Sequence, residues 1–278
     1  MKAFSALLEA LLFSPRRSVK QAHLVSWLRG TPVDDRGWGI AALTGELSFP
    51  NIKASVIRQL ATEVTDPELF ALSYDFVGDL AETVALLWPQ QNDRKHDVPP
   101  LSDIVETLIT ARRGAALPLL AQWMNIMTIS ERWALLKLAT GGMRVGVSAR
   151  MVRLALGEAY QEDVSEIEEI WPLISPPYHE LFDWLEGRRL RPQSKGRAVF
   201  RPLMLAHPLE DDVSTLSLDD WQIEWKWDGA RILLASADDG IRLFSRSGDD
   251  ISSAFPELTM AMQWRGVLDG ELLAGTPD

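Results

Sequence analysis

The spacing of hydrophobic residues along this chain changes near residue 192. Before that point, apolar residues recur at intervals of three and four, most clearly over residues 18–28, 51–64 and 101–113. This spacing is typical of helices that bury one face. Glycines, prolines and polar turns interrupt it at short intervals, and no repeat of fixed period is present. The pattern therefore predicts a bundle of short helices, an all-α domain over residues 1–195.

Single residues predict where some of these helices begin and end. Asp66-Pro67 is typical of a helix start, because the carboxylate caps free amides and proline suits the first helical position. Gly141-Gly142 is expected to end a helix that begins near Ser130, and Gly187 is expected to end a later one.

From residue 196 onward the pattern becomes that of β-strands. Residues 192–197, Pro-Gln-Ser-Lys-Gly-Arg, have the composition of a linker. Runs rich in aromatic and branched side chains follow at residues 221–226, 230–235, 241–246 and 267–274. Asp239-Gly240 between two of these runs is typical of a hairpin turn. The expected fold class is therefore multidomain, α followed by α+β, with the second domain covering residues 196–278.

Composition and charge narrow the possible functions. The chain has no cysteine, which excludes disulfides, thiol catalysis and cysteine-bound zinc, and fits a cytoplasmic location. No apolar run approaches the roughly 18 residues of a membrane span. The net charge of −11 weighs against a nucleic-acid partner, but residues 188–201 hold only basic charges: Arg188, Arg189, Arg191, Lys195, Arg197 and Arg201. This stripe is either a solvated linker or a phosphate-binding surface.

Three short motifs in the second domain carry chemically useful groups. They are Glu224-Trp225-Lys226-Trp227-Asp228-Gly229-Ala230-Arg231, then Ser245-Arg246-Ser247-Gly248, then Leu268-Asp269-Gly270-Glu271. A deprotonated lysine is a nucleophile, and arginines are forked donors to phosphate or ribose oxygens. A strand over residues 221–226 would place Glu224 and Lys226 on one face. Glu271 offers a carboxylate to a ribose hydroxyl or a magnesium ion.

Each motif alone has a simpler structural interpretation. Lys226 alone is most often a surface lysine, Arg246 a surface charge on a hairpin, and Asp269-Gly270 a turn. Their joint order and spacing favour a common functional site.

In combination, the three motifs resemble motifs I, Ia and III of the covalent nucleotidyltransferases, which include DNA ligases, RNA ligases and capping enzymes. The helical region separates these possibilities. Residues 141–148, Gly-Gly-Met-Arg-Val-Gly-Val-Ser, and residues 78–82, Gly-Asp-Leu-Ala-Glu, resemble segments of the helical DNA-binding domain of larger ATP-dependent DNA ligases. Residues 201–206 resemble the lead-in to their catalytic domain. Over nearly its whole length, the chain is similar to bacterial ATP-dependent DNA ligases.

This resemblance implies a role for each site residue. Lys226 would form a lysyl-AMP phosphoramide, and Glu224 would contact the adenine amino group. Arg231 and Arg246 would contact ribose or phosphate groups of the nucleotide and the nick. Glu271 would bind the ribose or Mg²⁺. Residues around Arg144, together with Arg197, would hold the duplex backbone without sequence preference. The expected cofactors are ATP and Mg²⁺, and the expected partner is nicked duplex DNA during repair, replication or recombination.

The family also has later motifs that this chain does not reach. These are an aromatic residue that stacks on adenine, a further glutamate, a lysine pair and an oligonucleotide-binding domain. We therefore interpret the chain as an N-terminal portion of such a ligase, and we expect it to bind DNA without joining nicks. Two alternatives remain: a non-catalytic duplex-binding protein, and another nucleotidyltransferase such as an RNA ligase.

Overall fold

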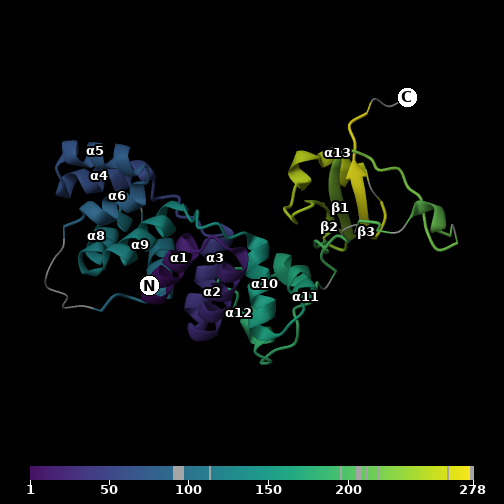
Figure 1. The fold of residues 1–278 in the computed structure, drawn as a ribbon, viewed down its shortest axis with the longest axis horizontal. Coiled ribbons are helices and arrows are strands. Elements are labelled where there is room, and N and C mark those ends of the chain that lie inside the picture. Colours follow the sequence, from purple (N-terminus) through teal and green to yellow (C-terminus); the bar gives the residue numbers. More distant parts are fainter. Residues whose placement is uncertain are drawn as a thin grey trace. The chain divides into compact units, whose positions relative to one another are not determined.

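The computed structural model describes residues 1–89, 97–112, 114–194, 196–204, 208–210, 212–217, 219–261 and 263–275. Its internal contacts divide the chain into two compact units. The first unit comprises residues 1–164 and 175–190, and the second comprises residues 165–174 and 191–278. The described part of the first unit has helices but no strands, and the second contains the sheet (Figure 1). The predicted order, helices and then a sheet, is confirmed.

Short helices build the first unit. They are α1 (Lys2–Phe13), α2 (Arg17–Gly30), α3 (Val33–Thr44), α4 (Ala54–Val64), α5 (Pro67–Val77), α6 (Leu80–Leu87), α7 (Leu101–Thr110), α8 (Ala116–Ile126), α9 (Ile129–Thr140), α10 (Ala149–Tyr160) and α12 (His179–Leu185). The three periodic segments of the sequence correspond to α2, α4 and α7. Among the described residues, no helix is long and apolar enough to cross a membrane.

The predicted helix ends are confirmed by their hydrogen bonds. Asp66 accepts a hydrogen bond from the Leu69 amide at 2.9 Å and so caps α5. Gly141 ends α9 in the left-handed conformation, with φ of 70°. Gly187 adopts φ of 73° just after α12. Glycine is favoured at the last two positions because a side chain would strain this conformation.

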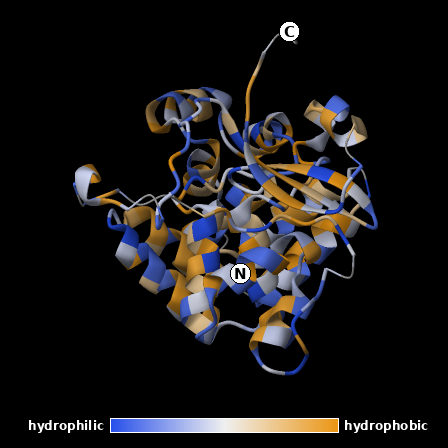
Figure 2. Cartoon of the chain, turned by 90° about the vertical axis from the view of Figure 1, so that its right-hand side faces the viewer, coloured by the Kyte–Doolittle hydropathy of each residue, from blue (hydrophilic) through white to orange (hydrophobic). Residues whose placement is uncertain are grey.

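Most of the helices have a hydrophobic and a hydrophilic side (Figure 2). The helices pack together where α2 contacts α10, α6 and α1 contact α9, and α3 contacts α7. Leu8, Leu28, Leu135 and Leu156 are almost fully buried in these contacts. Burial of such side chains contributes roughly 1.5–3 kcal/mol each, so the helical unit has a substantial core of its own.

A buried arginine lies within this helical core. Arg132 on α9 is only 2% exposed. Its guanidinium donates to the carbonyl oxygens of Met124 at 2.6 Å, Trp88 at 3.0 Å and Pro89 at 3.3 Å. These carbonyls lie near the C-terminal ends of α8 and α6, which have no helical partners for their last carbonyls. Arg132 therefore joins the ends of two helices to a third.

The second unit contains a three-stranded antiparallel sheet with the order β2-β1-β3 (Figure 1). The strands are β1 (Ala230–Ala237), β2 (Gly240–Ser245) and β3 (Gly266–Leu272). Ala237 pairs with Gly240, which confirms the predicted hairpin at this point. The unit also contains α11 (Val164–Ile170), except for its first residue, and α13 (Pro256–Ala261). Between them lie the short 3₁₀ turns Trp171–Leu173, Val213–Thr215 and Ser252–Ala254.

A small hydrophobic cluster covers one face of this sheet. Leu233, Ala235 and Phe244 pack against Ala198 and Phe200 from the segment that leads into the second unit. The rings of Phe200 and Phe244 lie edge to face, with centroids 5.9 Å apart. This cluster fixes the segment around residue 200 against the sheet.

The predicted strand over residues 221–226 is wrong. Residues 221–228 lie in neither a helix nor a strand, and all of them are exposed. Both edges of β1 are already taken by β2 and β3, and no described strand lies beside residues 221–226. A strand forms only when its backbone groups find partners, so propensity alone does not suffice. The expected placement of Glu224 and Lys226 on one face of a strand is therefore not supported.

Replacing Arg132 with methionine should destabilise the helical unit by about 3 kcal/mol, because it leaves buried carbonyl oxygens without donors. Urea unfolding followed by circular dichroism measures this change. The matched control is Arg29→Met, since exposed Arg29 donates to the carbonyls of Ala159 and Glu158 at the end of α10. The control should cost less than about 1 kcal/mol. Equal effects of the two substitutions would contradict the importance of burial.

Candidate functional site

Three of the predicted site residues meet at one end of the sheet. Arg231 at the start of β1 pairs directly with Glu271 on β3. Ser245 at the end of β2 pairs with Ile232, so Arg246 directly follows at the same end. The segment that carries Lys226 enters β1 at this end as well. The antiparallel register therefore gathers the three sequence motifs, although 45 residues separate Lys226 from Glu271 in number.

Arg231 is held in place by a forked ion pair. Its Nε and Nη2 donate to the two carboxylate oxygens of Asp269 at 3.0 and 2.6 Å, and Nη2 also donates to the Met204 carbonyl at 2.7 Å. The hydrogen bonds that Arg231 donates to Asp269 raise the pKa of Arg231. A bidentate pair of this kind fixes the plane of the guanidinium. The sequence indicated Arg231 but not its partner, because Asp269 was interpreted only as part of a turn.

Gly229 marks the point where the Lys226 segment joins the sheet. Its amide donates to the Glu271 carboxylate at 3.1 Å. A Cβ atom at this position would lie 2.3 Å from the Leu272 carbonyl oxygen and 2.8 Å from a Leu273 methyl carbon. The backbone at Gly229 therefore lies close to the end of β3. Only glycine fits here without moving the end of β3.

Lys226 and Glu224 are both exposed on this irregular segment. Lys226 makes no hydrogen bond or ion pair with any described residue, whereas Glu224 accepts a hydrogen bond from the Gln222 amide at 2.6 Å. Trp225 and Trp227 are 84% and 60% exposed. The sequence did not indicate that these tryptophans would lie uncovered.

Arg246 is exposed in the turn that follows β2. The Gly248 amide donates to the Ser245 carbonyl at 3.0 Å, and the Ser247 hydroxyl donates to the Asp249 carboxylate at 2.5 Å. These bonds shape the turn, and the Arg246 guanidinium is left exposed. The described residues contain no group of three acidic or histidine side chains that could hold a metal ion. Metal binding by Glu271 thus stays a prediction.

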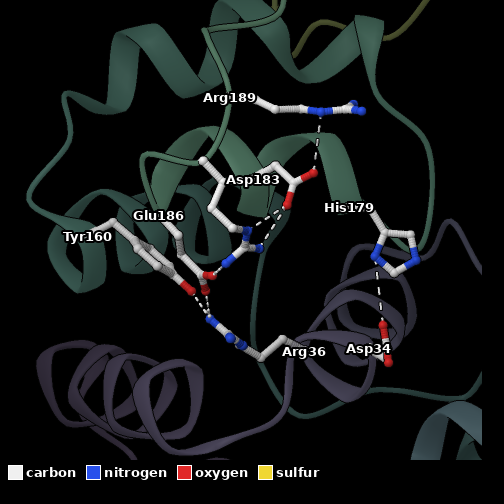
Figure 3. Close-up of polar contacts among 8 residues, drawn as sticks. Asp34, Arg36, Tyr160, His179, Asp183, Glu186 and Arg189 are labelled. Carbon is white, nitrogen blue, oxygen red and sulfur yellow. Dashed lines mark hydrogen bonds and ion pairs between the residues drawn. The ribbon is translucent and has the colours of Figure 1, made fainter.

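The basic residues of the 188–201 stripe are largely paired with acids. Arg188 pairs with Asp183 and Glu186, and Arg189 lies 3.7 Å from Asp183. Figure 3 shows the arginines of this network turned toward the carboxylates of α12 and the residue after it. Arg36 on α3 also reaches Glu186. These acids lie outside residues 188–201. They neutralise part of the positive charge of the stripe, which contains no acid of its own.

Two further arginines of the stripe are paired within the second unit. Arg191 lies 2.6 Å from Glu166 and 2.7 Å from Glu169, and Arg201 lies 3.6 Å from Glu169. Exposed Arg197 has no ion pair with any described residue, and Lys195 lies outside the described residues. The interpretation of the stripe as a broad phosphate-binding surface is thus weakened, and DNA contact by Arg197 stays a prediction.

A second group of basic residues lies at one end of the helical unit. Lys20 near the start of α2 contacts the loop before α10, and Arg29 near the end of α2 contacts the last turn of α10. The two helices therefore run parallel and begin side by side. Exposed arginines gather at this end, without ion pairs to described residues: Arg16, Arg17, Arg144 and Arg150. The first turn of neither helix contains an acid.

Sequence analysis identified Arg144 but missed its neighbours. Arg16 and Arg17 lie more than 120 positions away in the sequence, so only the packing of α2 on α10 brings them near the loop at residues 141–148. Two helix N-termini and four arginines without ion pairs among the described residues together make this end strongly positive, despite the negative net charge.

The other family-like segment, residues 78–82, is connected to this loop through α9. Asp79 caps α6 by accepting from the Glu82 amide at 3.0 Å, and it pairs with Lys137 in the last turn of α9 at 2.5 Å. Burial raises the pKa of Asp79, but the hydrogen bonds from Lys137 and nearby amides outweigh it and lower the pKa overall. Gly141 then ends α9 and begins the Arg144 loop.

Replacing Gly229 with alanine should disrupt the end of the sheet, because the new Cβ atom would collide with the Leu272 carbonyl. We expect the amide hydrogens at the β1–β3 end to exchange at least about tenfold faster, as local pairing opens. Gly270→Ala is the matched control, since a Cβ atom there would meet nothing within 4 Å. Exchange that stays unchanged in Gly229→Ala would show that this end tolerates a side chain.

Comparisons with known proteins reveal similarity to DNA ligases. A model described as the ATP dependent DNA ligase domain matches residues 203–278. A probable DNA ligase from Koribacter versatilis is 32% identical over 99% of this chain and 50% of its own length. A DNA ligase from Methanothrix thermoacetophila is 30% identical over 51% of this chain and 26% of its own length.

A probable DNA ligase from Sorangium cellulosum is 41% identical over a shorter stretch, 29% of this chain and 16% of its own length. The chain thus spans at most about half the length of these curated relatives. The ligase-domain match and the similarity to a ligase along nearly the whole chain agree with the resemblance noted in the sequence motifs. Together these similarities support an ATP-dependent DNA ligase.

Proposed function

We propose that this chain supplies the DNA-binding region and the AMP-accepting lysine of an enzyme that seals nicks in duplex DNA with ATP. The reaction has three steps. AMP is first transferred from ATP to Lys226, then from Lys226 to the 5′-phosphate of the nick. The 3′-hydroxyl finally attacks that phosphate and releases AMP.

The observation that carries this proposal is the convergence of the three motifs at one end of the sheet. Arg231 and Glu271 are direct cross-strand partners, and Arg246 lies just past the neighbouring pair. The segment bearing Lys226 leads into the same end. Two arginine forks, a lysine and a carboxylate are groups that can bind and react with a nucleoside triphosphate.

Each residue has a part in the first step. The deprotonated amine of Lys226 attacks the α-phosphorus of ATP, so that a phosphorus–nitrogen bond forms and pyrophosphate leaves. Arg231 and Arg246 stabilise negative charge on phosphate oxygens or bind the ribose, and Glu224 accepts a hydrogen bond from the adenine amino group. Glu271 holds a ribose hydroxyl or Mg²⁺. When bound, Mg²⁺ would neutralise charge on the leaving pyrophosphate.

The helical unit would hold the DNA through its basic end. The four arginines at the start of α2 and α10 are exposed and free of ion pairs among the described residues, unlike most of the 188–201 stripe. Contacts from such residues to phosphates release counterions from the duplex. The binding should therefore be independent of base sequence and strongly dependent on salt.

Lys226 should become labelled when the chain is incubated with ATP carrying a radioactive α-phosphate and Mg²⁺. The adduct should be labile to acid and stable to base, as expected for a phosphoramide. Both Lys226→Ala and Lys226→Arg should abolish it, because neither presents an attacking amine. Lys53→Ala, which changes an exposed lysine at the start of α4, is the control and should keep it. An undiminished adduct in Lys226→Ala, or none in the unchanged chain, would refute this assignment.

Arg144→Ala should weaken binding of the full chain to nicked duplex about tenfold, equally for unrelated sequences, and should reduce the slope of log affinity against log salt by about 0.9. Titration by fluorescence anisotropy at four salt concentrations measures both quantities. Arg191→Met is the control, because Arg191 is engaged with Glu166 and Glu169. A larger loss in the control than in Arg144→Ala would place the DNA on the stripe.

A further inference from the structure

We propose that Lys20 on α2 is a positioning residue, which holds the loop between α9 and α10 in the shape that presents Arg144 to duplex DNA. This inference rests on the proposed binding of DNA by the helical unit. It assigns a role to a lysine that no motif in the sequence singles out. Lys20 acts through the loop backbone and does not itself contact the DNA.

The first support is a direct contact between α2 and the loop. The Lys20 ammonium donates to the Val145 carbonyl oxygen at 2.5 Å, across 125 positions of sequence. Val145 is only 4% exposed, so its side chain anchors the loop in the core while Lys20 satisfies its carbonyl. Lys20 is half-buried and has no ion pair with any described residue. A cationic donor to a carbonyl makes one of the stronger hydrogen bonds available to a protein.

The second support is that the loop leaves room for the ammonium. Gly146 has φ of 69°, a left-handed conformation that side chains rarely adopt. A Cβ atom on Gly146 would lie 2.5 Å from the Lys20 nitrogen. The same glycine therefore allows the loop to turn and allows Lys20 to reach the carbonyl before it.

The third support is the tightness of the loop around Arg144. The Arg144 amide donates to the Gly142 carbonyl at 2.7 Å, and the Val145 amide donates to the Met143 carbonyl at 2.6 Å. Each bond spans only two residues, which indicates consecutive tight turns. Arg144 lies at the centre of this structure, one residue before the carbonyl held by Lys20. A shift of that carbonyl would redirect the Arg144 side chain.

Lys20 differs from the arginines around it in how its charge is used. Arg16, Arg17 and Arg144 are exposed and have no ion pairs among the described residues, whereas the Lys20 ammonium is directed into the loop. The exposed arginines can therefore contact DNA phosphates directly, whereas Lys20 holds the loop that carries Arg144. It also gives the two roles different signatures in the salt dependence of binding, because only a phosphate contact releases a counterion.

The test uses the full chain with nicked duplex DNA and compares Lys20→Met, Arg144→Ala and the double variant. Methionine keeps the length and the apolar stem of lysine but removes the donor. Lys53→Met is the matched control, since Lys53 is exposed at the start of α4. Affinity is measured by fluorescence anisotropy at four salt concentrations, and the melting temperature of each variant is recorded. Gly146→Ala provides a second way to displace the ammonium without removing its charge.

We expect Lys20→Met and Gly146→Ala to weaken binding by roughly 5- to 10-fold and to lower the salt slope by about 0.9, as Arg144→Ala does. The double variant should bind no more weakly than Arg144→Ala alone, with no further fall in slope. Lys53→Met should leave both quantities unchanged. A purely structural role for Lys20 would lower the melting temperature and leave the slope of the folded protein intact.

Three results would overturn the inference. Unchanged affinity in Lys20→Met would show that the loop needs no support from α2. A further loss of affinity and of slope in the double variant would show that Lys20 meets phosphate itself. If Lys20→Met fails to fold, Gly146→Ala decides, and normal binding by that variant overturns the inference. If the unchanged chain does not bind duplex DNA, both the proposed DNA binding and the role of Lys20 are refuted. This outcome differs from the other three, in which the unchanged chain binds DNA normally.

Discussion

The pairing of β1 on both of its edges is the constraint on which the candidate site depends. β2 and β3 run antiparallel to β1, and their registers bring Arg246 and Glu271 to the end where β1 begins. Two contacts secure that end: the forked pair between Arg231 and Asp269, and the bond from Gly229 to Glu271. A shift of one residue in either register would turn these side chains to the opposite face of the sheet. The sheet is small, but it brings parts of all three motifs to one end.

The helical unit presents positive charge at one end, although the whole chain has a net charge of −11. Most arginines of the 188–201 stripe are engaged with nearby carboxylates, and these pairs organise the segment around α12 and α11. The arginines at the start of α2 and α10 have no such partners among the described residues. Parallel packing of the two helices also aligns their N-terminal dipoles at that end. The location of the unpaired charge, more than its total, indicates where a phosphate backbone would bind.

Several features were predictable from sequence because they depend on local physics. The caps at Asp66 and Gly141, the periodic helices and the hairpin at Gly240 each follow from the conformational preferences of a few neighbouring residues. Of the residues that the three motifs assigned to one site, Arg231, Arg246 and Glu271 lie at one end of the sheet.

Other features depend on long-range contacts and were not predictable. Residues 221–226 have strong strand propensity, but no described strand pairs with them. The acids that neutralise Arg188 and Arg191 lie on α12 and α11 or just after them, and their alignment with the stripe emerges only on folding. Lys20 carries no motif, and its role appears only once α2 lies beside the loop before α10. Strand partners and ion-pair partners come from distant parts of the chain and are set by the fold. Helix caps and turns depend only on a few neighbouring residues.

The central claim is that one end of the small sheet is the nucleotide site. Its most direct test is photo-crosslinking of the chain with an azido-adenine analogue of ATP, followed by mass spectrometry of the labelled peptides. The account predicts labelled peptides from residues 219–231, 243–249 or 266–272, and protection of these peptides by excess ATP. Protectable labelling confined to the helical unit, residues 1–164 and 175–190, would contradict it.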